Sequence, residues 1–152
     1  MKDILKLRAH HLLCILGFRG KGYSPQFISN MERIVEKIKK NPQILIRLIH
    51  NADEICAPCP FREGKRCTRT PQAQVEIVKR DRKVLSLLGI YPPFVASALV
   101  LYFWIGRKIG LHKLKSICQG CVWEPLGYCR EGMKRLLEGK FFLSPVRLDF
   151  KK

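Results

Sequence analysis

Six of the seven cysteines in this 152-residue chain form two triplets with one spacing. Each triplet reads C-x2-C-x7-C, and the members are Cys56, Cys59 and Cys67, then Cys118, Cys121 and Cys129. A two-residue gap lets both sulfurs of a turn face one ion or cluster. Nearby Pro and Gly residues allow the tight turns that place the third thiolate beside the other two. The internal repeat, residues 55–67 and 117–129, therefore predicts two metal-binding loops.

The similarity between the two loops extends beyond the cysteines. An isoleucine precedes each CxxC, at Ile55 and Ile117, and an aromatic residue follows it by two positions, at Phe61 and Trp123. Apolar neighbours of this kind shield a redox cofactor from water.

The residues alone leave the kind of metal open. Four cysteines hold structural zinc, but they also hold iron-sulfur clusters, and the spacing here matches neither ferredoxin pattern. An odd number of cysteines cannot all pair as internal disulfides. Buried or disulfide-paired cysteines without a metal are the remaining interpretation.

The number of ligands restricts the possible centres. Two four-ligand centres need one further donor for each triplet, and Cys14 is the one remaining cysteine. A single centre could use the two CxxC pairs, or Cys14 with one triplet. A cluster held by three cysteines would leave one iron open to substrate.

Two histidines and one aspartate are candidates for supporting roles. His10 and His11 precede Cys14 by four and three residues, so either imidazole can share a helix face with the thiol. They could be ligands or a structural pair, since adjacent residues point in different directions along a helix. Asp81 falls on an apolar helix stripe and needs a buried partner, for which Arg8, His10 and His11 are the candidates. It could orient a ligating histidine or form an ion pair with Arg8.

The elements that must position these residues are mostly helical. Apolar periodicity predicts helices over residues 7–18, 24–41, 70–89, 94–105 and 130–138. Ser24 and Pro25 form a cap signal, as do Thr70 and Pro71. Residues 43–50 are open between a short strand and a buried helical turn, residues 108–117 form a basic connector, and an irregular tail contains Pro145. The expected fold is a mainly α single domain over residues 1–152, with two cysteine-bearing loops and one short β element near residues 43–50.

Charge and targeting signals set the cellular context. There are 29 Lys and Arg residues against 12 Asp and Glu, a formal net charge of +17, which favours nucleic acid, another polyanion or an anionic membrane surface as partner. No secretory signal is visible, so a cytoplasmic location is expected. The uncharged run from Ile90 to Gly106 contains a helix too short to span a bilayer and is expected to be buried on all sides.

Several motifs together resemble a known family. They are Leu7-Arg8-Ala9-His10-His11-Leu12-Leu13-Cys14, Gly20-Lys21-Gly22-Tyr23-Ser24-Pro25, Asp53-Glu54-Ile55-Cys56 and Arg80-Asp81. The chain resembles the uncharacterised prokaryotic domain-of-unknown-function family 1284 from Leu7 to the final triplet. That resemblance implies iron-sulfur binding, with a cluster of the four-iron type, and no established reaction or ligand set.

Three functions are consistent with these features. The first is an iron-sulfur protein that passes electrons to a redox partner or senses redox state. The second is a zinc-stabilised nucleic-acid-binding module, in which Lys and Arg residues such as Lys65, Arg66 and Arg69 contact phosphates. The third is a metalloenzyme with an open coordination site near His10, His11 and Asp81. No nucleophile elbow, phosphate loop, Rossmann fingerprint or HExxH motif is present.

Overall fold

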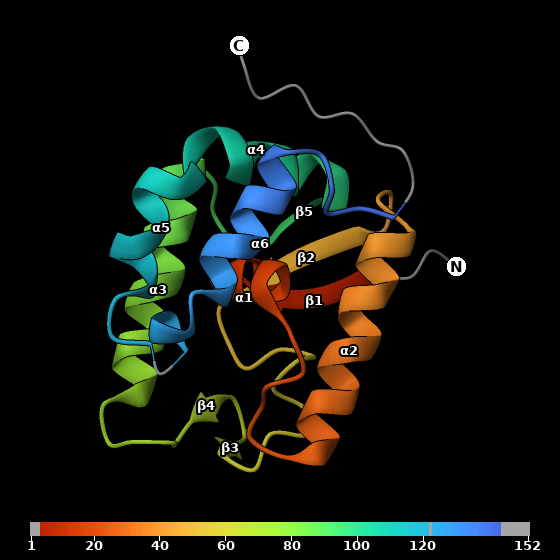
Figure 1. Ribbon diagram of the computed structural model, residues 1–152. Coiled ribbons are helices and arrows are strands. Elements are labelled where there is room, and N and C mark those ends of the chain that lie inside the picture. Colours follow the sequence, from red (N-terminus) through yellow and green to blue (C-terminus); the bar gives the residue numbers. More distant parts are fainter. Residues whose placement is uncertain (1–3, 122, 144–152) are drawn as a thin grey trace.

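The computed structural model describes residues 4–121 and 123–143. It is mainly helical with a small sheet, as predicted (Figure 1). In chain order the elements are β1 (Ile4–Arg8), α1 (His11–Gly17), α2 (Pro25–Lys40), β2 (Leu45–Ile49), β3 (Arg62–Glu63), β4 (Arg66–Cys67), α3 (Ala73–Leu88), β5 (Phe94–Ser97), α4 (Ala98–Lys108), α5 (Gly110–Cys118), the 3-10 helix η1 (Glu124–Leu126) and α6 (Tyr128–Leu137). The expected irregular tail at Pro145 lies outside the described residues.

A three-stranded sheet in the order β1-β2-β5 forms the base of the site. β1 pairs with β2 in parallel, from Ile4 opposite Leu45 to Arg8 opposite Ile49, and β5 pairs with β2 antiparallel. The short β element expected near residues 43–50 is confirmed as β2. The helix expected from Leu7 is wrong at its start: Leu7 and Arg8 belong to β1, whose buried Leu5 and Leu7 alternate with exposed Lys6.

Two of the helices follow the sequence signals closely. In α2, the Ser24 side chain accepts a hydrogen bond from the Phe27 amide at 3.0 Å, and Pro25 is the first helical residue. In α3, the stripe that faces the core contains Asp81 between apolar neighbours, as expected. Figure 1 shows α1 at the centre of the molecule, between α2 on one side and α3 and α5 on the other.

The apolar segment after Pro93 differs from the expectation of one fully buried helix. Its first residues, Phe94–Ser97, form β5, and α4 begins at Ala98. The helix exposes Val100 at 38% while it buries Leu101, Tyr102 and Ile105. The residues expected to connect it to the second cysteine loop form a helix of their own, α5. None of the helices in the described part of the chain has the length and apolar character that a membrane crossing requires.

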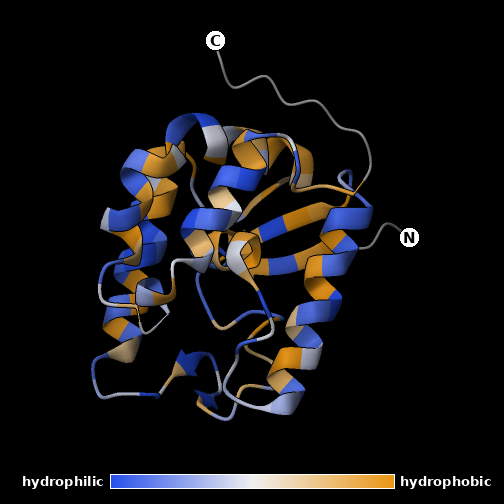
Figure 2. Cartoon of the chain, viewed as in Figure 1, coloured by the Kyte–Doolittle hydropathy of each residue, from blue (hydrophilic) through white to orange (hydrophobic). Residues whose placement is uncertain are grey.

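The core joins the sheet to α1, and α1 to α6. Figure 2 shows hydrophobic residues concentrated along the strands and α1, with hydrophilic residues on the outward sides of the surrounding helices. At the contact of α1 with α6 the backbones approach closely: a Cβ on Gly17 would lie 2.6 Å from Cys129 Cα, and a Cβ on Gly132 would lie 2.1 Å from the Leu16 carbonyl oxygen. The two glycines therefore allow Cys129 to reach the helix that carries Cys14.

Candidate metal centre

The candidate site begins where two parallel strands end. β1 ends at Arg8 and is followed by His10 and His11, whereas β2 ends at Ile49 and is followed by the loop that carries Asp53 and Cys56. Because β1 and β2 run in parallel, their carboxyl ends meet at one edge of the sheet, the place where open sheets bind ligands.

Asp81 joins α3 to this edge through two of its three expected partners. Its Oδ2 accepts a hydrogen bond from Arg8 Nε at 2.8 Å, and its Oδ1 lies 2.6 Å from His10 Nδ1 and accepts from the His10 amide at 3.0 Å. Burial opposes ionisation of Asp81, but the hydrogen bond and charge of His10 and the charge of Arg8 outweigh it and lower the pKa to about 2. His11, the third candidate, pairs with a different carboxylate and has no hydrogen bond or ion pair with Asp81 among the described residues.

That second carboxylate is Asp53, which lies fully buried three residues before Cys56. Its Oδ2 accepts from the Arg8 amide at 2.7 Å and lies 2.7 Å from His11 Nδ1. Its Oδ1 accepts from the amides of Ile55 at 3.0 Å and Cys56 at 3.1 Å. Burial alone would raise the pKa of Asp53. The contacts outweigh burial, those with His11 most strongly, so the pKa of Asp53 is lowered. Asp53 thus fixes both the first CxxC turn and the His11 ring.

The two histidine rings lie together and do not point apart. Their centroids are 4.3 Å from each other, because His10 precedes α1 and each ring is held by its own carboxylate. Burial lowers the pKa of His10 from 6.5 to about 4 against the opposing effect of Asp81. A neutral imidazole that donates its Nδ1 proton to the carboxylate retains a lone pair on Nε2, the atom available to a metal.

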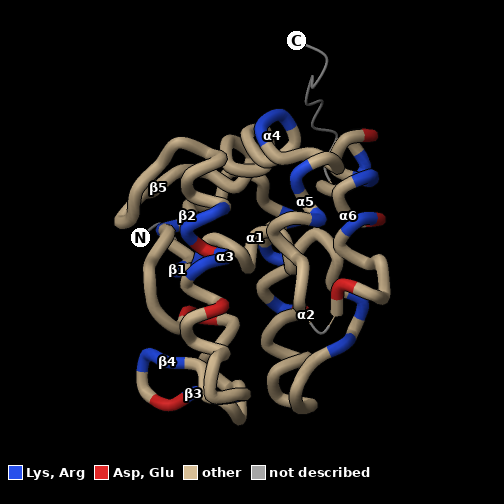
Figure 3. Tube along the Cα trace, turned by 90° about the vertical axis from the view of Figure 1, so that its left-hand side faces the viewer, with Lys and Arg blue, Asp and Glu red and all other residues tan. Residues whose placement is uncertain are grey.

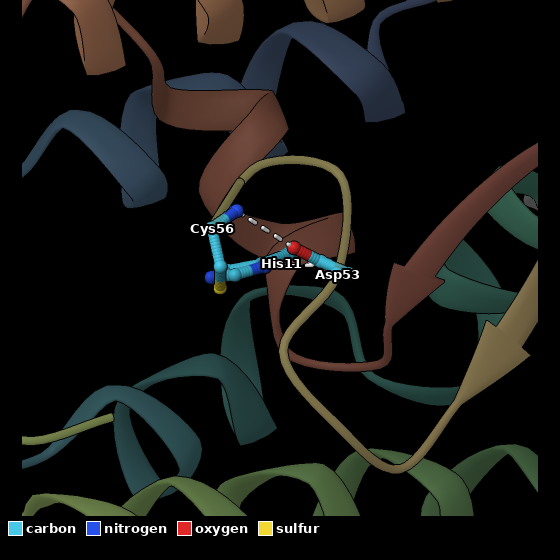
Figure 4. A group of neighbouring side chains, drawn as sticks. All are labelled: His11, Asp53 and Cys56. Atoms are coloured by element: carbon cyan, nitrogen blue, oxygen red, sulfur yellow. Dashed lines mark hydrogen bonds and ion pairs between the residues drawn. The ribbon is translucent and has the colours of Figure 1, made fainter. Parts of the chain in front are cut away.

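His11, Asp53 and Cys56 form a compact donor group (Figure 4). One ligand atom from each lies within 4.8 Å of the other two, which suits a single ion. Both oxygens of Asp53 already have two close partners, however, and a carboxylate offers about four acceptor positions. We therefore assign Asp53 to orienting His11 and Cys56, which leaves His11 and Cys56 as the donors.

The cysteine repeat extends to the backbone of the two CxxC turns. The Cys59 amide donates to the Cys56 carbonyl at 2.9 Å, and the Cys121 amide donates to the Cys118 carbonyl at 2.9 Å. In each turn, the residue three positions after the second cysteine donates to that cysteine's carbonyl at 3.2 Å. The loops diverge afterwards: Cys67 ends β4 of a hairpin, whereas Cys129 lies in α6.

Cys14 associates with the second triplet. The Cys118 and Cys129 thiols interact as a hydrogen-bonding pair, which raises the pKa of Cys118 and lowers the pKa of Cys129. Burial, followed by the nearby sulfurs of Cys129 and Cys121, raises the pKa of Cys14 well above its usual value. Four thiols from α1, α5, the second loop and α6 therefore form one interacting group, Cys14-Cys118-Cys121-Cys129.

The first triplet meets this group across a cavity of about 90 Å³. Five of the seven cysteines line it: Cys14, Cys56, Cys59, Cys67 and Cys121. His10 and His11 also line it. A neighbouring cavity of about 40 Å³ is lined by Cys14, Cys121 and Cys129. Cys118 lines neither cavity, and reaches the group through Cys129.

The donors fit a metal guest chemically. All seven cysteines carry free thiols. Burial raises the pKa of Cys56 to about 12 and raises that of Cys59, so these thiols hold their protons unless a cation stabilises the thiolates. Aromatic side chains cover the space between the two loops: Tyr23 stacks on Trp123 at 4.9 Å and meets Phe61 edge-on at 5.2 Å.

Comparison with known proteins gives one family. Residues 22–127 match DUF1284, a family described as protein of unknown function. The chain belongs to DUF1284. The match to DUF1284 is narrower than the resemblance predicted from the sequence, since it begins at Gly22 and excludes His10, His11, Cys14 and Cys129. No curated protein and no solved structure matches the chain.

Two residues of the site were not predicted as site residues, although both belong to the motifs that carry the family resemblance. Asp53 was visible as an acid three residues before Cys56, a spacing typical of side chains that cap a turn. Arg80 lines the larger cavity, and its buried Nε has no hydrogen-bond partner among the described residues. No periodicity marked Arg80, because its role depends on how α3 packs against the second loop.

Proposed function

We propose that this DUF1284 member binds an iron-sulfur cluster of the four-iron type and uses it to transfer electrons or to sense redox state. The observation that carries the proposal is the convergence of thiols, from both halves of the repeat and from α1, on two neighbouring cavities that share Cys14 and Cys121. A cluster bound at these shared thiols would supply one-electron redox chemistry.

The ligand set that the contacts favour is Cys14, Cys118, Cys121 and Cys129. These thiols influence one another directly, whereas the nearest partners of Cys56 are Asp53 and Arg8. Four cysteine thiolates are the usual ligands of a four-iron cluster. Cys56, Cys59 and Cys67, with His10 or His11, would face the same guest or a second one.

The chain's own residues would prepare the site in three ways. Asp53 orders the first CxxC turn, Gly17 and Gly132 admit Cys129 to α1, and the aromatic side chains limit the access of water. Exclusion of water matters for a redox cofactor because solvent exposure alters its potential.

Anaerobic purification and reconstitution test the proposal. We expect a brown protein that contains iron and acid-labile sulfide, with a cluster signal in Mössbauer or paramagnetic resonance spectra. Cys14→Ser and Cys129→Ser should lower iron per chain at least tenfold, whereas the matched variant Cys67→Ser should keep at least half. A colourless wild-type protein that holds zinc and no iron would contradict the cluster, and full iron content in Cys14→Ser would contradict the ligand set.

The zinc-stabilised nucleic-acid module is the second candidate. The hairpin β3–β4 places Arg62, Lys65 and Arg66 beside Cys67, and Figure 3 shows basic residues on this hairpin. Salt-dependent RNA binding by a colourless zinc form would favour it.

A further inference from the structure

The cavity of about 90 Å³ between the two cysteine loops is lined by charged residues of one type. Five arginines line it, namely Arg8, Arg62, Arg66, Arg69 and Arg80, but no lysine and no carboxylate among the described residues does so. The sequence contains more lysines than arginines, so a solvated basic face would have included lysines. Arginine's planar fork binds carboxylate and phosphate groups in a bidentate manner, which a lysine ammonium cannot do.

Two of the five arginines are committed to protein partners. Arg8 is paired with Asp81 and also reaches the His50 carbonyl at 3.4 Å. Arg62 donates to the carbonyls of Ala57 at 3.3 Å and Gly64 at 3.1 Å, and so holds the first cysteine loop.

The other three retain unused donors. Arg66 and Arg69 flank Cys67, and neither has a carboxylate partner among the described residues. Arg69 lies with its guanidinium 6.0 Å from the centre of the Tyr23 ring. Arg80 approaches the Gln119 carbonyl at 3.4 Å through Nη2, while its buried Nε has no acceptor. A buried donor without a partner costs free energy that a ligand oxygen would recover.

We propose that this cavity binds a small oxyanion, a carboxylate or phosphate group, through Arg66, Arg69 and Arg80. The volume of about 90 Å³ has room for roughly six or more water-sized groups, which suits a compact metabolite and not a polymer. Apolar side chains, among them Met31 and Ile77, line the same cavity and would contact the rest of the ligand. This anion site goes beyond the proposed cluster binding. It does not depend on which metal the thiols hold, although the anion would lie beside the thiols that hold that metal.

Calorimetric titration of the full chain with inorganic phosphate and with malonate tests the proposal. Both the reduced metal-free form and the iron-loaded form are used, and iron and sulfide are measured on the same samples. We expect one bound anion per chain in at least one form. The double variant Arg66→Gln/Arg69→Gln should lose at least tenfold in affinity while its iron content and circular dichroism spectrum stay unchanged.

The matched control is Arg82→Gln/Arg130→Gln, which removes the same charge from two exposed arginines outside the cavity. It should bind the anion as the wild type does. The proposal is overturned if neither anion binds the wild type in either form, or if both double variants lose affinity equally. Binding of a single-stranded RNA oligonucleotide without binding of phosphate or malonate would also overturn it. The iron and sulfide contents of the same samples test the proposed cluster independently of anion binding.

Discussion

The buried carboxylates Asp53 and Asp81 perform the same task on two neighbouring histidines. Each approaches Nδ1 of its ring, and each also contacts Arg8, one through the backbone amide and the other through the guanidinium. Arg8 is therefore the shared partner in a buried network that links β1, α3 and the loop after β2, with its amide on Asp53 and its guanidinium on Asp81. Removing one member leaves another charge unpaired.

Asp81→Asn tests the strength of this network. We expect it to lower the free energy of unfolding by about 3 kcal/mol, because the Arg8 charge would stay buried without its counter-ion. Urea unfolding of the metal-free protein measures the change. Glu76→Gln, an exposed substitution on the same helix, is the control and should stay within about 0.5 kcal/mol of the wild type. A similar loss in both variants would contradict the assignment.

The sequence predicted Asp81 but not Asp53, for a physical reason. A carboxylate on an apolar helical stripe must be buried, so its need for a partner follows from periodicity alone. Asp53 lies in a loop, and its burial arises when that loop folds onto β1 and α1. The choice of partners, with His10 on Asp81 and His11 on Asp53, likewise depends on tertiary packing.

Among the elements, the long amphipathic helices and the short strand β2 were predictable, whereas the strands β1 and β5 were not. The apolar periodicity of α2 and α3 is intrinsic to the chain, whereas β1 and β5 exist because β2 pairs with both. The cysteine spacing predicted the two CxxC turns. It could not predict that Cys14 joins the second triplet, since that pairing depends on the contact of α1 with α6.

Gly132→Ala probes that contact. The new methyl group would meet the Leu16 carbonyl, and separating the two helices should cost about 2 kcal/mol even though Ala favours a helix. Because Cys129 lies on the same helix, iron per chain should also fall. Thermal unfolding and iron analysis measure the two effects. The control is Lys134→Ala, at an exposed position of α6, which should change neither the thermal stability nor the iron content. A Gly132→Ala protein with wild-type stability and iron content would contradict a close contact between the two helices.

At the scale of the whole molecule, the free energy of unfolding of the metal-free protein should fall strongly as the pH is lowered. The pKa of His10 is about 4 in the folded chain against 6.5 ordinarily, so between these values the unfolded chain binds more protons and stability falls as the pH falls. The shift corresponds to about 3 kcal/mol. Asp81, with a pKa of about 2 instead of 3.8, adds a further loss between pH 4 and pH 2. A net charge of +17 that grows on acidification acts in the same direction.

Urea unfolding at a series of pH values measures this dependence. We expect most of the loss above pH 4 to disappear in His10→Asn, which removes the titrating ring. The loss below pH 4 should shrink as well, because His10 contributes most to lowering the pKa of Asp81. Stability that is flat from pH 7 to pH 4.5 in the wild type would contradict a buried neutral His10.

The contact between α1 and α6 also sets the order in which a centre held by both Cys14 and Cys129 would be built. Strands β2 and β5 of the sheet and the helices α2 to α5 lie between these two cysteines in the chain, so the two thiols cannot meet during synthesis until that whole stretch has emerged and folded. Metal insertion at the proposed ligands would therefore come after folding of the stretch, and the thiols would have to stay reduced until then.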